Sequence, residues 1–202
     1  MKKMYYNLRR IFSKKNKIFY VILFIFIIGL ISGSLYITML NNKDKLYILG
    51  KITNYYSNYS KITLDDKLLI FKNSLINNIL YIIIIWILGI SVIGIPIVLI
   101  LIFFKSFVLG FSISSIYAKY KLSSFLKIML YLFPSNIIIL IYTLFLCTFS
   151  ILLSINLINS AFYKKSFNFG SFMGKYLFIL LIGIILSILS SLIDAFIMPL
   201  LY

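Results

Sequence analysis

The sequence predicts an all-α integral membrane protein: a polytopic bundle of about five transmembrane helices with amphipathic helices at the interface. Hydrophobic residues make up 62% of the chain and charged residues 12%, whereas a globular domain averages about 25% charged. Between Asn78 and Tyr117 about forty residues contain only one charged side chain, Lys105. A water-soluble helix needs a polar face, so a run of this length and composition belongs in lipid.

A basic tail, residues 1–17, precedes the first predicted span, residues 18–40. The tail carries seven Lys or Arg residues and no acid. Two interpretations remain open: a basic amphipathic helix lying on anionic lipid, or a frayed tail that only sets orientation. Either explains the net charge of +16 through membrane lipids, so we expect no nucleic acid as a partner. The run 18–40 is too long for a signal-peptide core, so we expect it to stay as an anchor.

The middle of the chain predicts a loop followed by a membrane hairpin. Residues 41–73 are polar and rich in Tyr, and we expect them to form the largest segment outside lipid. Residues 75–93 and 97–117 each supply about the 20 residues that a span needs. The segment Gly94-Ile95-Pro96 is predicted to be the turn, too short to hold a soluble loop. The two helices should therefore contact each other along their length.

The second half predicts two more spans. Residues 119–133 place apolar side chains on one helical stripe, which favours a helix lying in the interface, although part of a kinked span is the alternative. Pro134 is predicted to start a new helix, because proline is tolerated in a first turn and costly inside a helix. Span four covers residues 137–157, and span five covers residues 176–198.

Five spans place the two termini on opposite sides of the membrane. The positive-inside rule weighs Lys and Arg near the span ends. The tail holds seven and the connector 158–175 holds three, against six in the loop 41–73 and three around 119–127. We expect a cytoplasmic N-terminus, with the Tyr-rich loop and the C-terminus outside.

The residue inventory argues against catalysis. The chain has no His and no Glu, and its only acids are Asp44, Asp65, Asp66 and Asp194. Acid–base hydrolysis needs a poised pair, a zinc site needs three or four ligands, and nucleophilic catalysis needs a base beside the nucleophile. We therefore predict no catalytic residue, no metal site and no cofactor.

Two charged residues fall inside predicted spans. Lys105 lies roughly 12 Å deep at 1.5 Å per residue, where a charge costs a few kcal/mol unless it is paired or hydrated. Asp194 is the only acid in a span and the natural counter-ion, yet the two could differ in depth by about 10 Å. Two interpretations remain open: a direct pair, or a snorkelling Lys105 with an interfacial Asp194.

Small residues mark possible packing faces. Gly29 and Gly33 form a Gly-x-x-x-Gly pattern in span one, and Ser187, Ser190 and Ser191 lie together in span five. Such faces allow close approach of helices in membranes. They could serve packing within the bundle or bind a partner helix.

One motif carries a resemblance to a known family. The motif residues are Trp86, Gly89, Ser91, Gly94, Pro96, Phe103 or Phe104, Lys105, Gly110 and Phe111, with a Phe-Pro-x-Asn stretch at Phe133, Pro134 and Asn136. This pattern resembles the bacterial stage II sporulation protein M family over nearly the whole chain. Ser106 stands where the family often has glycine.

The resemblance implies a function, and the residues alone leave two classes open. A compact bundle without a catalytic set favours a membrane scaffold. Lys105 and the predicted helix breaks at Gly94–Pro96 and Pro134 favour a small-solute permease, but a permease usually has an internal repeat, and the sequence shows none. The resemblance implies a scaffold in the mother-cell membrane at the septum, which positions peptidoglycan hydrolases during engulfment of the forespore. Stage II sporulation proteins P and D are the partners it implies.

Overall fold

A computed structural model of the chain describes residues 2–57, 63–163 and 168–197. Apart from short turns and caps these residues are helical, and none of them forms a strand. The elements are α1 (Lys2–Met39), α2 (Asn42–Ser57), α3 (Leu64–Ile90), α4 (Gly94–Tyr163), α5 (Phe169–Leu192) and the π-helix η2 (Ile193–Ile197). Five stretches are long and apolar enough to cross a membrane: Lys17–Met39, Leu64–Ile90, Gly94–Lys119, Ser135–Phe162 and Phe169–Ile197. The predicted fold class is confirmed.

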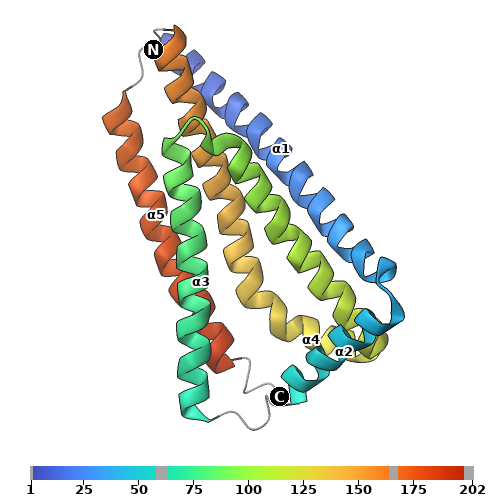
Figure 1. Cartoon of the computed structure of the whole chain (residues 1–202). Helices are drawn as coiled ribbons and strands as arrows, with labels where there is room; N and C mark the ends of the chain where they lie inside the picture. Colours follow the sequence, from blue (N-terminus) through green and yellow to red (C-terminus); the bar gives the residue numbers. More distant parts are fainter. Residues whose placement is uncertain (1, 58–62, 164–167, 198–202) are drawn as a thin grey trace.

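The bundle is built around the second half of α4. In Figure 1, α1 runs down, α3 runs up, α4 runs down and returns, and α5 runs down to end at η2. We call Gly94–Lys119 the descending half of α4 and Ser135–Phe162 its ascending half. Over an 18-residue stretch of the ascending half, 67% is buried inside the bundle, against 17–28% of a stretch of the same length in each of the other four spans. It is therefore the central helix on which the others pack.

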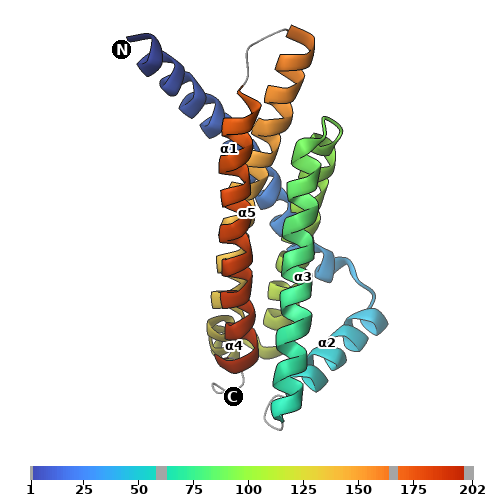
Figure 2. The same ribbon diagram turned by 90° about the vertical axis from the view of Figure 1, so that its left-hand side faces the viewer.

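The basic tail is the first part of α1. The helix is unbroken from Lys2 to Met39, so its length is about 57 Å at 1.5 Å per residue. The hydrocarbon core of a bilayer is only about 30 Å thick. Figure 2 shows the N-terminal part of α1 extending away from the other helices. The side chains of residues 2–16 lie outside the described ones, so the predicted lipid contacts of the tail stay a prediction.

Glycine brings α1 and the descending half of α4 into close contact. A Cβ on Gly33 would meet the backbone carbonyl of Phe107, and one on Gly29 would meet the side chain of Ser106. Gly110 lies in the same way against the backbone of α1. Of the two roles left open for Gly29 and Gly33, the structure shows packing within the bundle.

The turn of the membrane hairpin lies three residues earlier than predicted. Helix α3 ends at Ile90 and α4 begins at Gly94, so the turn is Ser91 to Ile93. The prediction that placed it at Gly94 to Pro96 is wrong, because Pro96 is tolerated in the first helical turn, where its missing N–H has no intrahelical acceptor. Gly94 is required for another reason: a Cβ there would meet the carbonyl of Leu88.

Helix α4 does not begin again at Pro134. It is assigned as a single helix from Gly94 to Tyr163, and it changes direction at the lower end of the bundle in Figure 1. The predicted break in the helix before Pro134 is therefore wrong, since a proline inside a helix removes one hydrogen bond and can bend the chain without ending the helix. The predicted fourth span is nevertheless present, because the chain turns back and a separate span begins at Ser135. The side chains of residues 120–134 lie outside the described ones, so the interfacial stripe stays a prediction.

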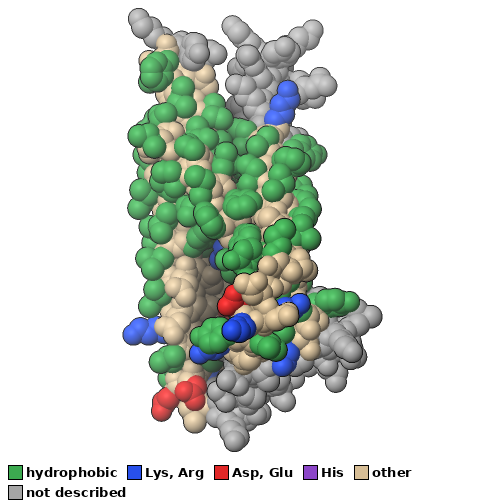
Figure 3. All heavy atoms as spheres, turned by 45° about the vertical axis from the view of Figure 1, so that its right-hand side comes forward, with side chains coloured by type: hydrophobic (Ala, Val, Ile, Leu, Met, Phe, Trp, Pro, Cys, Tyr) green, Lys and Arg blue, Asp and Glu red, His purple; other side chains and the backbone are tan. Residues whose placement is uncertain are grey.

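Much of the predicted loop 41–73 is helical. It contains α2 and the first turns of α3, whose start is fixed by a capping box. The Thr63 N–H donates to the Asp66 carboxylate at 3.0 Å, and the Asp66 N–H donates to the Thr63 hydroxyl at 3.4 Å. Figure 3 shows apolar side chains over the middle of the molecule and most of the coloured charged side chains at its lower end. Helix α3 thus begins in the polar zone before it enters the apolar belt.

Replacing Gly33 by Val should destabilise the seam between α1 and α4. The new side chain would overlap the backbone of Phe107, which can move only together with its helix. Overpacking of this kind costs about 1–3 kcal/mol of folding free energy. Unfolding of the purified protein in detergent measures the loss. Gly174→Val in α5 is the matched control, because a Cβ there meets nothing within 4 Å. Equal stability of the two variants would contradict close packing of α1 against α4 at Gly33.

Candidate functional site: a polar interior that joins the helices

The signature residues Trp86 and Gly89 lie where α3 meets α5. The Trp86 indole Nε1 donates to the Tyr176 carbonyl at 3.3 Å, and the Tyr176 hydroxyl donates to the Trp86 carbonyl at 2.9 Å. The two rings stack with centroids 5.4 Å apart. A Cβ on Gly89 would meet the Tyr176 hydroxyl. The small residue is therefore needed so that this reciprocal pair can close.

Two serines attach the ascending half of α4 to the end of α3. Ser150 donates to the Ile85 carbonyl at 3.1 Å, and Ser154 donates to the carbonyls of Gly89 and Ser91 at 2.9 and 3.0 Å. The last carbonyls of any helix lack intrahelical partners. In hydrocarbon there is no water to replace those partners, so Ser154 completes the end of α3 from the neighbouring helix. Ser150 adds a second bond to α3 one turn earlier, at the Ile85 carbonyl.

Lys105 is half-buried in the descending half of α4. It lies about 17 Å along α4 from Gly94, counted at 1.5 Å per residue. Its ammonium lies over the ring of Tyr81, 4.6 Å from the centroid, and the Tyr81 hydroxyl donates to the Leu101 carbonyl at 3.1 Å. All the Asp side chains of the chain lie in the described ranges, and none forms an ion pair with Lys105.

Asp194 has a different partner. It lies in η2, where its carboxylate accepts a hydrogen bond from the Ser74 hydroxyl at 2.6 Å. Ser74 in turn lies 3.5 Å from the amide nitrogen of Asn78. Ser74 precedes Tyr81 by about 10 Å along α3. Of the two interpretations left open, the structure shows separate partners for Lys105 and Asp194 and no direct pair.

The remaining predicted residues have packing or surface positions. Ser187, Ser190 and Ser191 are all buried, and Ser190 donates to the Ser135 carbonyl at 3.1 Å. Pro96 is exposed in the first turn of α4, and Asn136 is exposed at the start of its ascending half. Of the span-five serines, Ser190 bonds α5 to α4, whereas Ser187 donates to the Gly183 carbonyl within α5.

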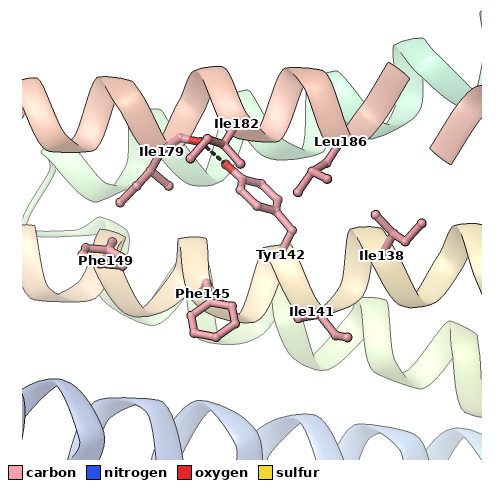
Figure 4. Close-up of a pocket in the computed structure, with 8 residues that line it drawn as sticks. All are labelled: Ile138, Ile141, Tyr142, Phe145, Phe149, Ile179, Ile182 and Leu186. Atoms are coloured by element: carbon pink, nitrogen blue, oxygen red, sulfur yellow. Dashed lines mark hydrogen bonds between the residues drawn. The ribbon is translucent and has the colours of Figure 1, made fainter. Parts of the chain in front are cut away.

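An apolar cavity of about 440 Å³ lies between the ascending half of α4 and α5 (Figure 4). Its lining consists of Ile138, Ile141, Tyr142, Phe145, Phe149, Ile179, Ile182 and Leu186. The only polar side-chain group among them, the Tyr142 hydroxyl, donates to the Ile179 carbonyl at 2.7 Å. The cavity therefore suits hydrocarbon and presents no group for chemistry.

The acids do not assemble into a reactive site. Asp44 lies in α2, Asp65 and Asp66 lie at the start of α3, and Asp194 lies in η2. Within the described ranges no three His, Cys, Asp or Glu side chains come close enough to hold a metal ion. What the interior offers is a set of hydrogen bonds that fix the helices relative to one another.

Sequence reasoning missed several of these contacts. Tyr81, Tyr142 and Tyr176 were not singled out, and neither were Ser74, Ser150 and Ser154. A signal was present for some: Ser74, Asn78 and Tyr81 are spaced by four and three residues, which places them on one face of α3. Ser150 and Ser154 are likewise one turn apart. Polar residues that share a face inside an apolar span indicate an interhelical contact.

Lys105→Glu should lower the amount of folded protein, and Asp194→Lys should not restore it. The two side chains have separate partners, so a reversed pair has no contact to rebuild. Folded protein is measured by gel filtration in detergent after membrane extraction. Tyr81→Leu is the informative companion, because it removes the ring beneath the ammonium. Rescue of Lys105→Glu by Asp194→Lys would contradict the arrangement.

Comparison with known proteins gives one match. Residues 22–199 match the family described as Stage II sporulation protein M, SpoIIM. No curated protein and no solved structure matches the chain. The match spans most of the sequence and includes most of the first apolar span, the other four spans, the hairpin and the Trp86–Tyr176 contact. The chain is a multi-pass membrane protein that belongs to the stage II sporulation protein M family.

Proposed function

We propose that this protein is a non-catalytic membrane scaffold of the sporulating mother cell. It anchors and positions peptidoglycan hydrolases at the septum for septal thinning and engulfment of the forespore. One observation carries the proposal beyond the family: Trp86, Ser150 and Ser190 each donate a hydrogen bond from one helix to a neighbouring one, and these bonds join α3, α4 and α5. A protein without His or Glu, whose interior groups serve packing, is suited to hold an enzyme and not to cut the wall itself.

The proposed partners are membrane-anchored hydrolases, stage II sporulation proteins P and D. The proposed orientation has a cytoplasmic N-terminus, which places α2 and the bend of α4 outside, nearest the wall. Figure 1 supports a shared outer platform, because α2 and the bend lie at the same end of the bundle. Interfaces favour aromatic residues, and the segment 41–73 is rich in Tyr.

A small-solute permease is the second candidate, and Lys105 is the observation that favours it. A charge about 17 Å into a span marks a substrate or ion pathway in many transporters. Transporter sites also use broken helices near the midplane. The breaks here lie at the hairpin turn and the bend of α4, which are at the two ends of the bundle in Figure 1. Scaffold function is therefore the better supported of the two.

Reporter fusions test the orientation. Fusions after Lys17 and after Lys175 should read as cytoplasmic, and fusions after Asn54 and at Tyr202 as external, because an acid-free basic tail resists translocation. Alkaline phosphatase and a fluorescent protein give opposite readouts on the two sides. Termini on the same side would contradict a bundle with five spans.

Deleting the gene tests the function. Sporulating cells should stall before engulfment, with the hydrolases diffuse in the membrane and no longer concentrated at the septum. Fluorescence microscopy of tagged hydrolases measures this, and purified protein incubated with peptidoglycan should release no muropeptides. Normal engulfment with localised hydrolases would contradict the scaffold. Solute uptake by vesicles containing the purified protein would support the permease instead.

A further inference from the structure

The descending half of α4 presents one side to the membrane between α1 and α3. Both helices pack on α4 and hardly contact each other. Between them Ile100, Phe104 and Val108 are 53%, 59% and 59% exposed. Figure 3 looks onto this side of the molecule, where the surface is hollowed beside α3. We call this feature the α1/α3 groove, with the descending half of α4 as its floor.

The α3 wall of the groove is not purely apolar. Ile84 and Leu80 are exposed on it, and Asn77, one turn from Tyr81 on the same flank, is also exposed. The structure gives the Asn77 amide no hydrogen-bond partner among the described residues. Tyr81 faces the floor at this height, with the Lys105 ammonium over its ring. The groove thus combines an apolar floor with an amide and a cation.

No carboxylate of the described residues balances the charge in the groove. A cation over an aromatic ring gains less free energy than a charge loses when it leaves water for the centre of a bilayer. None of the four Asp side chains pairs with Lys105. The membrane acid Asp194 is bonded to Ser74, about 10 Å further along α3.

These features decide between the possible occupants. Lipid chains can cover the floor, but they offer nothing to the ammonium or to the Asn77 amide. A second copy of this chain offers no acid at the level of Lys105: Asp65 and Asp66 lie at the start of their span, and Asp194 lies three residues from the end of its span and is already bonded to Ser74. The missing component is therefore a carboxylate supplied at mid-depth by a different helix.

We propose that the α1/α3 groove binds a single transmembrane helix of a partner protein, which carries an Asp or Glu at the level of Lys105. The carboxylate pairs with the ammonium, Asn77 bonds to the partner's polar groups, and its apolar side chains cover Phe104 and Val108. This proposal rests on the scaffold function above and names the surface that holds a partner's anchor.

Synthetic single-span peptides in phosphatidylcholine vesicles provide the test. Leucine-rich helices with a central Asp, Leu or Lys are titrated against the full-length protein, and energy transfer between labels on their ends reports binding. The Asp peptide should bind at least tenfold more tightly than the Leu peptide. Lys105→Ala should abolish that preference, and Lys105→Glu should transfer it to the Lys peptide.

Matched variants locate the contact. Ile100→Trp places a large side chain on the floor of the groove and should weaken binding of the Asp peptide at least tenfold. Ile185→Trp should not, since Ile185 is similarly exposed, at 58%, but lies on α5. Lys105→Gln replaces Lys105→Glu if the latter does not fold.

The proposal that the groove binds a helix with a carboxylate would be overturned by equal binding of the Asp and Leu peptides. An unchanged preference for the Asp peptide in Lys105→Ala would also overturn it. So would equal effects of the two Trp variants, which would place the peptide elsewhere. Such results leave the scaffold function standing if the deletion strain still loses hydrolase localisation. The two proposals therefore fail separately.

Discussion

The lack of water in the bilayer core is the constraint on which the rest of this structure depends. Polar groups there must find partners inside the bundle. The carbonyls near the end of α3 are met by Ser150, Ser154 and Tyr176 from the neighbouring helices. Each bond of this kind contributes only about 0.6 kcal/mol on average, so their value lies in fixing which helix faces which. Close approach at glycine then supplies the contact area.

The sequence predicted the fold well because the membrane reduces the problem to one dimension. Length and hydropathy were sufficient for the five spans, and the motif around Trp86 and Gly89 placed the chain in its family. The turn and the start at Pro134 were misplaced because a proline tolerates both the first turn of a helix and a bend within it. Neighbours of a side chain depend on rotation about the helix axis, which apolar sequence encodes weakly. That is why the partners of Lys105, Asp194 and Tyr176 needed the structure.

The family motif has two structural roles. Trp86, Gly89 and Gly94 fix how α3 meets α5 and how the hairpin turns. Lys105 satisfies no such requirement and costs stability where it lies. The motif thus combines residues that the packing of the helices requires with a charged residue, Lys105, that the packing does not require. The proposed binding of a partner helix in the α1/α3 groove rests on this difference.

The unbroken course of α1 has a mechanical consequence. A continuous helix is stiff over the length of one domain, so Lys2 and Gly33 belong to a single rod with no hinge between them. The helix is held against α4 at the close contacts of Gly29 and Gly33. Any sideways displacement of the protruding basic end, for instance by a crowded or curved lipid surface, becomes a rotation of the same rod within the membrane. The tilt of α1 against α4 within the membrane would thus depend on the shape of the lipid surface that the basic end contacts.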